Sequence, residues 1–355
     1  MEKKSNSIVI WRIIFTYFVT GFHFDNQYLI TYSLGLDNGT YLSVEFFFMV
    51  TGYLMYEGYL KNPTKYPSGL HYLWARVKKL FPYYWGSYAL LFLWLFYKQG
   101  IRLTLYSISY HYPELLGLQC MGLNEGWTNL NNSTWYISVM LLGGFILYHC
   151  LVKWKDNFLN FIAPIMIVVF YSYIYRYNGG LHVAMQTEGF YINLGLMRGM
   201  AAMCLGIFAC RLNHKIRELR IKDGFLKFLG GFGFAFIMAA SMVCGWSVRD
   251  YLYLIIETFC VAFCFLPSNR KIYSNRLIQK WADSTVCIYL THMMFASEIF
   301  PRYIRIPDAL SLKFLYLIIY FVVITLFGIV FKLFVDWLMK AIKKRFLVDT
   351  NRVKC

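Results

Sequence analysis

The feature that most constrains this chain is a series of about ten apolar stretches, each close to twenty residues long, joined by short loops. About twenty apolar residues are needed for a helix to cross the hydrocarbon core of a bilayer. The composition agrees, because 59% of the 355 residues are hydrophobic and only 15% are charged. We therefore expect an all-α integral membrane protein, built as a single polytopic bundle of about ten transmembrane helices.

The remaining segments are short. Segment 102–120 is amphipathic and interrupted by Pro113, so it is predicted to be interfacial or re-entrant and not to cross. Residues 1–340 should form the transmembrane domain and 341–355 a short basic cytoplasmic tail, without a sizeable soluble domain or a cleavable signal peptide. The predicted spans are 8–30, 41–60, 81–98, 134–152, 158–176, 190–210, 225–245, 250–267, 284–301 and 312–336.

Lysine and arginine are distributed unevenly between the two sides of these spans. Segments on one side hold 24 of them, and the alternate loops hold 6. Because cytoplasmic loops carry the excess of positive charge, both termini are predicted to be cytoplasmic. The same distribution accounts for the net charge of +17. A phosphate-binding face is therefore not needed to explain it, and we expect no nucleic-acid partner.

The cysteines give no sign of a metal centre. The nine cysteines form no CxxC pair, and no Cys/His cluster with metal-binding spacing is apparent. Most of them lie inside apolar runs, where a thiol behaves as a small hydrophobic group. We therefore expect no metal.

Ionisable residues in the first span are the strongest indication of chemistry, because charged groups in hydrocarbon usually face a cavity or a site. Arg12 and His23 are eleven residues apart, which returns to within roughly 20° of the same helix face and separates them by about 16 Å along the axis. The orientation places Arg12 near the cytoplasm and His23 in the outer half. The structural alternative is a snorkelling arginine and a histidine bonded between helices.

Glu45 begins the second span, at a depth that should resemble that of His23. A carboxylate beside an imidazole orients the ring and favours its protonated form. Asp25 lies about 200° around the helix from His23 and should point away. The alternative is that Glu45 only caps the second helix at the interface.

Basic residues also open the third span. Arg76 and Lys79 are three apart on one helix face, just before Pro82, which suits a first helical turn. Such a pair would hold the phosphates of an anionic cosubstrate, or it would only set the topology. Four further polar residues within spans are each as easily structural as functional, namely Arg198, Glu257, His292 and Glu298.

These residues resemble the motifs of acyltransferase family 3, the integral-membrane O-acyltransferases that acylate cell-surface glycans. The similar positions follow one another in the family's order across nearly the whole chain. They are Arg12 and His23; Val44-Glu45-Phe46-Phe47-Phe48 with Gly52-Tyr53-Leu54; Arg76 with Pro82-Tyr83-Tyr84-Trp85; Trp135-Tyr136-Ile137; Arg198 with Gly206; and Tyr289-Leu290-Thr291-His292.

Two positions depart from the family's pattern. Thr51 stands where the family usually has serine and keeps the hydroxyl. Lys79 replaces the second arginine of the basic motif, so a planar fork gives way to a point charge. The substitution puts bidentate phosphate binding in doubt, but not the attraction of an anion.

The resemblance implies an acyl-CoA cosubstrate, usually acetyl-CoA, and an extracytoplasmic carbohydrate acceptor, either a polysaccharide or a lipid-linked glycan. Arg12, Arg76 and Lys79 would hold the phosphates of CoA near the cytoplasm. The positions that the resemblance assigns to the substrate site are Trp135, Tyr136, Arg198 and His292.

The expected mechanism centres on His23. It would act as a general base on the sugar hydroxyl, with Glu45 holding its ring, or it would carry the acyl group covalently. By resemblance we expect a multi-pass protein of a bacterial cytoplasmic membrane. The competing function is a transporter or flippase of lipid-linked sugars, which would favour internal repeats and paired broken helices. The sequence shows neither.

Overall fold

The structure is a computed structural model, and it describes residues 6–121, 130–184, 186–188, 192–219, 223–268 and 270–352. Within these ranges the fold is dominated by helices, as predicted. The long helices are α1 (Ile8–Tyr28), α3 (Ser43–Lys61), α4 (Gly69–Tyr110), α6 (Trp135–Lys153), α8 (Ala163–Asn178), α9 (Leu194–Glu218), α10 (Asp223–Cys244), α11 (Arg249–Cys264), α13 (Arg276–Met293) and α15 (Leu310–Arg352).

Short elements join the long helices. The only paired strands among the described residues are two antiparallel strands of two residues each, β1 (Thr187–Glu188) and β2 (Ile192–Asn193). The short α-helices are α2 (Ile30–Ser33), α5 (Tyr112–Leu115), α7 (Lys155–Asn157), α12 (Lys271–Ser274) and α14 (Phe300–Tyr303). The 3₁₀ and π turns are η1 (Gly39–Leu42), η2 (Gln119–Met121), η3 (Asn132–Thr134), η4 (Phe158–Ile162) and η5 (Met294–Ile299).

Each predicted span coincides with a long helix, but the count of ten crossings is not confirmed. In the described part of the chain, six helical segments are long and apolar enough to cross a membrane. Helix α11 has only 16 residues, and α4 carries several charges along its first half. The six segments are Ile8–Tyr28, Asn132–Lys153, Lys155–Asn178, Leu194–Glu218, Asp223–Cys244 and Leu310–Arg345.

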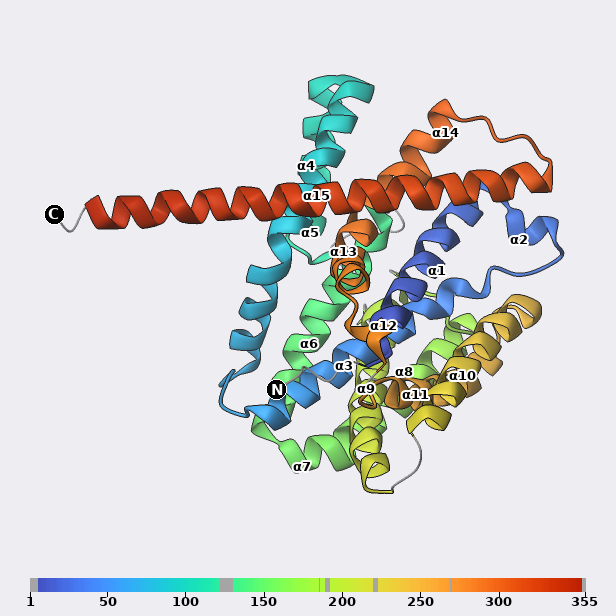
Figure 1. Ribbon diagram of the computed structural model, residues 1–355, viewed down its shortest axis with the longest axis vertical. Coiled ribbons are helices and arrows are strands. Elements are labelled where there is room, and N and C mark those ends of the chain that lie inside the picture. Colours follow the sequence, from blue (N-terminus) through green and yellow to red (C-terminus); the bar gives the residue numbers. More distant parts are fainter. Residues whose placement is uncertain are drawn as a thin grey trace.

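Helix α4 bends where the predicted interfacial segment begins. Gly100 has a φ of 76°, a left-handed conformation that only glycine adopts without strain, and the helix resumes beyond it. Pro113 then lies in the first turn of the short helix α5, where a proline removes no helical hydrogen bond. Figure 1 shows α15 crossing beside α13 and α4, with its C-terminal end extending beyond the bundle.

Helices α3 and α9 cross in close backbone contact. A Cβ on Gly52 would lie 1.9 Å from the carbonyl oxygen of Met203, and one on Gly206 would lie 2.0 Å from that of Met49. Small residues at such crossings let helix backbones touch, which replaces the hydrophobic driving force that is absent in lipid. The middle of α3 is thereby fixed against α9.

Helices α1 and α13 lie side by side and run in the same direction. Near the start of α1, Arg12 donates to the carbonyl of Ala282, and near its end the ring of His23 faces that of His292. Residue numbers increase in the same direction along both helices, so the two helices are parallel. Arg12 and His23 therefore occupy one seam, as their spacing predicted.

Candidate active site

His23 lies one turn from the C-terminal end of α1, half-buried between two cavities. Both cavities are lined by His23, Asn26 and Asn132. No side chain in the described residues forms a hydrogen bond with the imidazole of His23. The ring is therefore exposed to two separate spaces and is available to a bound ligand.

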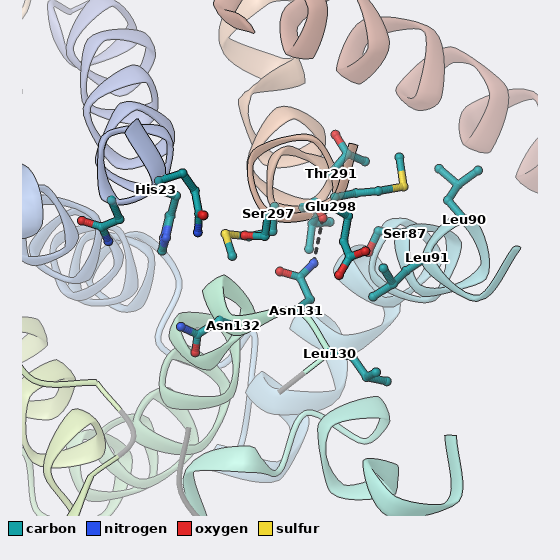
Figure 2. A pocket seen from close by; sticks show the side chains of 15 residues that line it. His23, Ser87, Leu90, Leu91, Leu130, Asn131, Asn132, Thr291, Ser297 and Glu298 are labelled. Atoms are coloured by element: carbon teal, nitrogen blue, oxygen red, sulfur yellow. Dashed lines mark hydrogen bonds between the residues drawn. The ribbon is translucent and has the colours of Figure 1, made fainter. Parts of the chain in front are cut away.

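The first of these spaces, here called the polar cavity, has a volume of about 290 Å³. Figure 2 shows His23 on one side of it, Asn131 and Asn132 below, and Ser297 and Glu298 opposite. Glu298 lies in the π turn η5, which places it on the cavity wall. Its Oε2 accepts from Lys98 at 2.7 Å and from Trp94 at 3.1 Å, while its Oε1 takes no hydrogen bond from the described residues.

The second space, here called the aromatic cavity, has a volume of about 250 Å³. Its walls include Phe22, Tyr41, Trp135 and His182, with Arg198 at its edge. His182 belongs to the loop between α8 and β1, and its ring lies 5.4 Å from that of Tyr41 between centroids. Desolvation and then the positive charge of Arg198 lower the pKa of His182, so this ring is neutral at pH 7.

His292 is the ring nearest to His23. Their centroids are 5.2 Å apart, and His292 is fully buried at the end of α13. Its Nδ1 lies 2.5 Å from the carbonyl oxygen of Tyr289, and a carbonyl only accepts, so Nδ1 carries the hydrogen. Its Nε2 is therefore a lone-pair acceptor, and no described residue satisfies it.

Glu45 does not make the predicted contact with His23. Both of its carboxylate oxygens accept hydrogen bonds from the guanidinium of Arg198, which reaches across from α9. The pair is buried, with side chains 0% and 3% exposed. A planar guanidinium matches a carboxylate in such a two-pronged contact, and this satisfies the charge of Glu45 without the imidazole.

Arg198 also fixes the wall of the aromatic cavity. It donates to the carbonyl oxygen of Val183 at 2.5 Å and to that of Tyr41 at 3.0 Å. Asp250 supports the same region, since it accepts from the Tyr41 hydroxyl and from the amide of Leu181, both at 2.8 Å. One arginine thus ties together η1, α3 and the loop that follows α8.

A second buried carboxylate positions the asparagines. Glu114, at 0% exposure, accepts from the amide of Leu130 at 2.9 Å and from that of Asn131 at 2.7 Å. Asn131 in turn donates to the carbonyl oxygen of Leu290 at 3.0 Å, the dashed line in Figure 2. Because Asn132 follows directly, it is held at the junction of the two cavities. Sequence reasoning did not identify these groups.

Arg12 lies near the N-terminal end of α1, about 16 Å along the helix axis from His23. It donates to the carbonyl oxygen of Ala282 at 3.2 Å and interacts electrostatically with Asp283 and Tyr136. The hydroxyl of Tyr136 lies 3.2 Å from that of Thr51. Tyr136 also interacts electrostatically with Arg76. A polar line therefore connects Arg76, Tyr136 and Arg12 inside the bundle.

Arg76 and Lys79 line a third space, here called the basic cavity, of about 370 Å³. Lys65 contributes a third cation to it. Tyrosine rings make up much of the remaining wall, and the guanidinium of Arg76 lies over one of them, Tyr72, at 4.8 Å. The other tyrosines of the wall are Tyr59, Tyr66 and Tyr148.

The four residues that the resemblance assigned to the substrate site divide between these spaces. Trp135 and Arg198 line the aromatic cavity, and the guanidinium lies 5.7 Å from the centroid of the indole ring. Tyr136 lies along the polar line toward the basic cavity. His292 borders His23 itself.

The family model described as an acyltransferase domain, that of acyltransferase family 3, matches residues 6–333. The chain belongs to acyltransferase family 3. No match was found among curated proteins or among solved structures. Membership of this family, together with the apolar helices, makes the chain a multi-pass membrane acyltransferase.

Proposed function

We propose that this acyltransferase moves an acyl group, most simply acetyl, from cytoplasmic acyl-CoA to a hydroxyl of an extracytoplasmic polysaccharide or lipid-linked glycan. The observation that carries the proposal is the position of His23, whose ring borders both the polar and the aromatic cavity. Two reactants that enter from different directions can meet only at such a junction.

The polar cavity suits a sugar. Carbohydrate hydroxyls both donate and accept, and this cavity offers amide and hydroxyl groups together with a carboxylate. The free Oε1 of Glu298 accepts from one acceptor hydroxyl, since its Oε2 is already occupied. The amides of Asn26 and Gln27 line the same cavity.

The basic cavity suits the phosphates of CoA. Lys65, Arg76 and Lys79 supply cations, and tyrosine rings supply flat surfaces on which an adenine base stacks. Along α3, Gly58 lines the basic cavity and Val44 the aromatic cavity, a separation of about 21 Å at 1.5 Å per residue. The extended pantetheine arm lies along this path, past Tyr136 and Arg12, and brings the thioester to His23.

The chemical step then requires two proton transfers, one to His23 and one from it. His23 takes the proton of the sugar hydroxyl as the oxygen attacks the thioester carbonyl, which forms a tetrahedral intermediate. The intermediate collapses by breaking the carbon–sulfur bond, and the proton on His23 passes to the departing thiolate of CoA. The amide of Asn132 stabilises the oxyanion, since it lies at the junction of both cavities.

His292 is the group that orients His23 in this proposal. The Nε2 lone pair of His292 has no partner in the structure, and in the proposed mechanism it accepts the ring N–H of His23 when the substrates are bound. The other nitrogen of His23 is then free to take the hydroxyl proton. Glu45 acts indirectly. It holds the guanidinium of Arg198, and Arg198 in turn holds the wall of the aromatic cavity. Glu45 is therefore a positioning residue.

The test uses membranes from cells that express the chain, incubated with radiolabelled acetyl-CoA and purified cell-surface glycan. Label on the glycan that depends on expression of the chain supports the proposal. Sugar movement across the membrane without acyl transfer would instead support the transporter.

A further inference from the structure

Three residues with metal-binding atoms meet at the end of α3, next to the basic cavity but not among the residues that line the three cavities. Glu57 comes from α3, and Cys210 and His214 come from α9. The Sγ of Cys210 lies 3.4 Å from the Oε2 of Glu57, and the Nε2 of His214 lies 2.7 Å from the same oxygen. The three ligand atoms all lie within 4.8 Å of one another.

The helix geometry explains why these residues meet. Cys210 and His214 are four residues apart, so they project from one face of α9. That face is the one that α3 touches at Gly206, a single turn before Cys210. The close crossing at Gly52 and Gly206 holds the two backbones at a fixed distance. Glu57 is therefore presented to α9 by rigid elements and not by a loop.

The kinds of ligand atom and their proximity favour a tetrahedral zinc ion. Zinc takes sulfur at about 2.3 Å and nitrogen or oxygen at about 2.0–2.2 Å, which separates neighbouring ligand atoms by roughly 3.3–3.7 Å. The separation of 3.4 Å between Cys210 Sγ and Glu57 Oε2 lies in this range, whereas the hydrogen-bonded pair His214 Nε2 and Glu57 Oε2, at 2.7 Å, must move apart by about 0.6 Å to hold the ion. The other oxygen of Glu57, Oε1, is bound to Lys61 at 2.8 Å, so a single carboxylate oxygen faces the cluster. We propose that Glu57, Cys210 and His214 bind one zinc ion, with water in the fourth position.

Binding rearranges two protons. The thiol of Cys210, which donates to Glu57 in the structure, loses its proton to solvent and coordinates as the thiolate. In the structure Nε2 of His214 donates its hydrogen to the Oε2 of Glu57; on binding, this hydrogen leaves Nε2, the ring keeps one hydrogen on Nδ1, and the Nε2 lone pair coordinates the ion. The side chain of His214 is 43% exposed, which gives the ion and the released proton a path to water.

The ion would brace one wall of the basic cavity. Gly58 and Tyr59, which line that cavity, directly follow Glu57 in α3. A metal that ties Glu57 to α9 holds this last turn of α3 in place. The proposal departs from the expectation of no metal, and it does not depend on the proposed function, because zinc binding is measured without any acyl transfer.

The experiment uses the full chain, purified in detergent and stripped of metal with EDTA. Zinc content after dialysis, calorimetric titration with Zn²⁺ and the melting temperature are measured for the wild type, for Cys210→Ser and for His214→Gln. We expect one zinc ion per chain in the wild type and a melting temperature that rises with zinc. Both variants should bind no zinc, and their melting temperature should not rise when zinc is added. Cys244→Ser removes an exposed thiol outside the cluster and should retain both.

His214→Gln keeps the test decisive if Cys210→Ser fails to fold, because its side chain is partly in solvent. A wild-type protein that takes up no zinc at micromolar concentrations overturns the proposal. So does zinc binding that survives in His214→Gln, since the ion would then sit on other thiols.

Discussion

At the scale of single residues, His23 and His292 form the centre of the proposed chemistry. His292 carries its hydrogen on Nδ1, its Nε2 has no partner among the described residues, and the centroid of the His23 ring is 5.2 Å from its own. An orienting group of this kind acts on the rate of the chemical step and not on the binding of either substrate. This separation distinguishes it from a residue that only fills space.

The first prediction concerns His292→Phe. An aromatic ring is kept and the acceptor is lost, so kcat should fall about 10²-fold through misorientation of His23. The KM for acyl-CoA should stay unchanged, because the basic cavity is distant. His149→Gln, outside all three cavities, is the control. Equal losses in kcat and in substrate binding would instead indicate a purely structural role.

The second prediction concerns the cations of the basic cavity. Arg76→Ala and Lys79→Ala should each raise the KM for acyl-CoA by about 10-fold or more, since a hydrogen bond to a charged group contributes about 1.5–3 kcal/mol. Lys78→Ala is the matched control, because Lys78 does not line the cavity and packs over Trp74. Lys79→Arg should lower the KM, because it restores a planar fork. An unchanged KM in both alanine variants would remove the basic cavity as the donor site.

The residue-level contacts show what sequence reasoning can reach. Helix periodicity is local, so it placed Arg12 and His23 on one seam correctly. The partner of Glu45 is Arg198, which lies 153 residues away, and no local pattern says which helix packs opposite. The sequence places Glu45 and His23 at a similar depth in the membrane, which made His23 the predicted partner of Glu45.

Contacts between distant segments also explain why the sequence did not identify three other groups. Glu114 is bonded to a loop that follows it by 16 residues or more, and no local pattern marks the asparagines of that loop as site residues. Cys210 and His214 are spaced four apart on one helix face, which was a usable signal. Only Glu57, from another helix, makes that pair a cluster.

At the scale of elements, the crossing of α3 and α9 organises the molecule. It lies between the Glu45–Arg198 pair at one end of α3 and the Glu57 cluster at the other. The two glycines at the crossing leave no room for a methyl group. Changes at the crossing should therefore affect the whole bundle.

The third prediction tests this crossing with Gly52→Ala. A methyl group 1.9 Å from a backbone oxygen forces the helices apart, and overpacking of this kind costs about 1–3 kcal/mol. The melting temperature in detergent should fall. Gly58→Ala, in the same helix, is the matched control, because a Cβ there meets nothing within 4 Å. If both variants melt like the wild type, α3 and α9 do not touch as described.

At the scale of the whole molecule, the apolar pattern predicted the fold well because each span must satisfy its own backbone hydrogen bonds in lipid. All predicted spans fall on helices. Length and apolarity single out six of the segments in the described chain. Among the others, α11 has only 16 residues, and the charged residues Glu45 and Glu57 lower the hydropathy of α3.

The fourth prediction concerns the two sides of the membrane. If the termini are cytoplasmic, a fluorescent protein fused after the last residue should fold and fluoresce inside the cell. In inside-out vesicles loaded with glycan, acyl-CoA supplied outside should support acylation, because the basic cavity then faces the medium. In right-side-out vesicles the same addition should give no product. Product in right-side-out vesicles alone would reverse the orientation.

The most direct measurement of the central claim is glycan acylation by His23→Gln, using radiolabelled acetyl-CoA and membranes with matched amounts of wild-type and variant protein. Glutamine keeps a polar side chain of similar size but cannot take a proton, so transfer should fall by about 10²–10⁴-fold. Transfer at the wild-type rate would contradict the account.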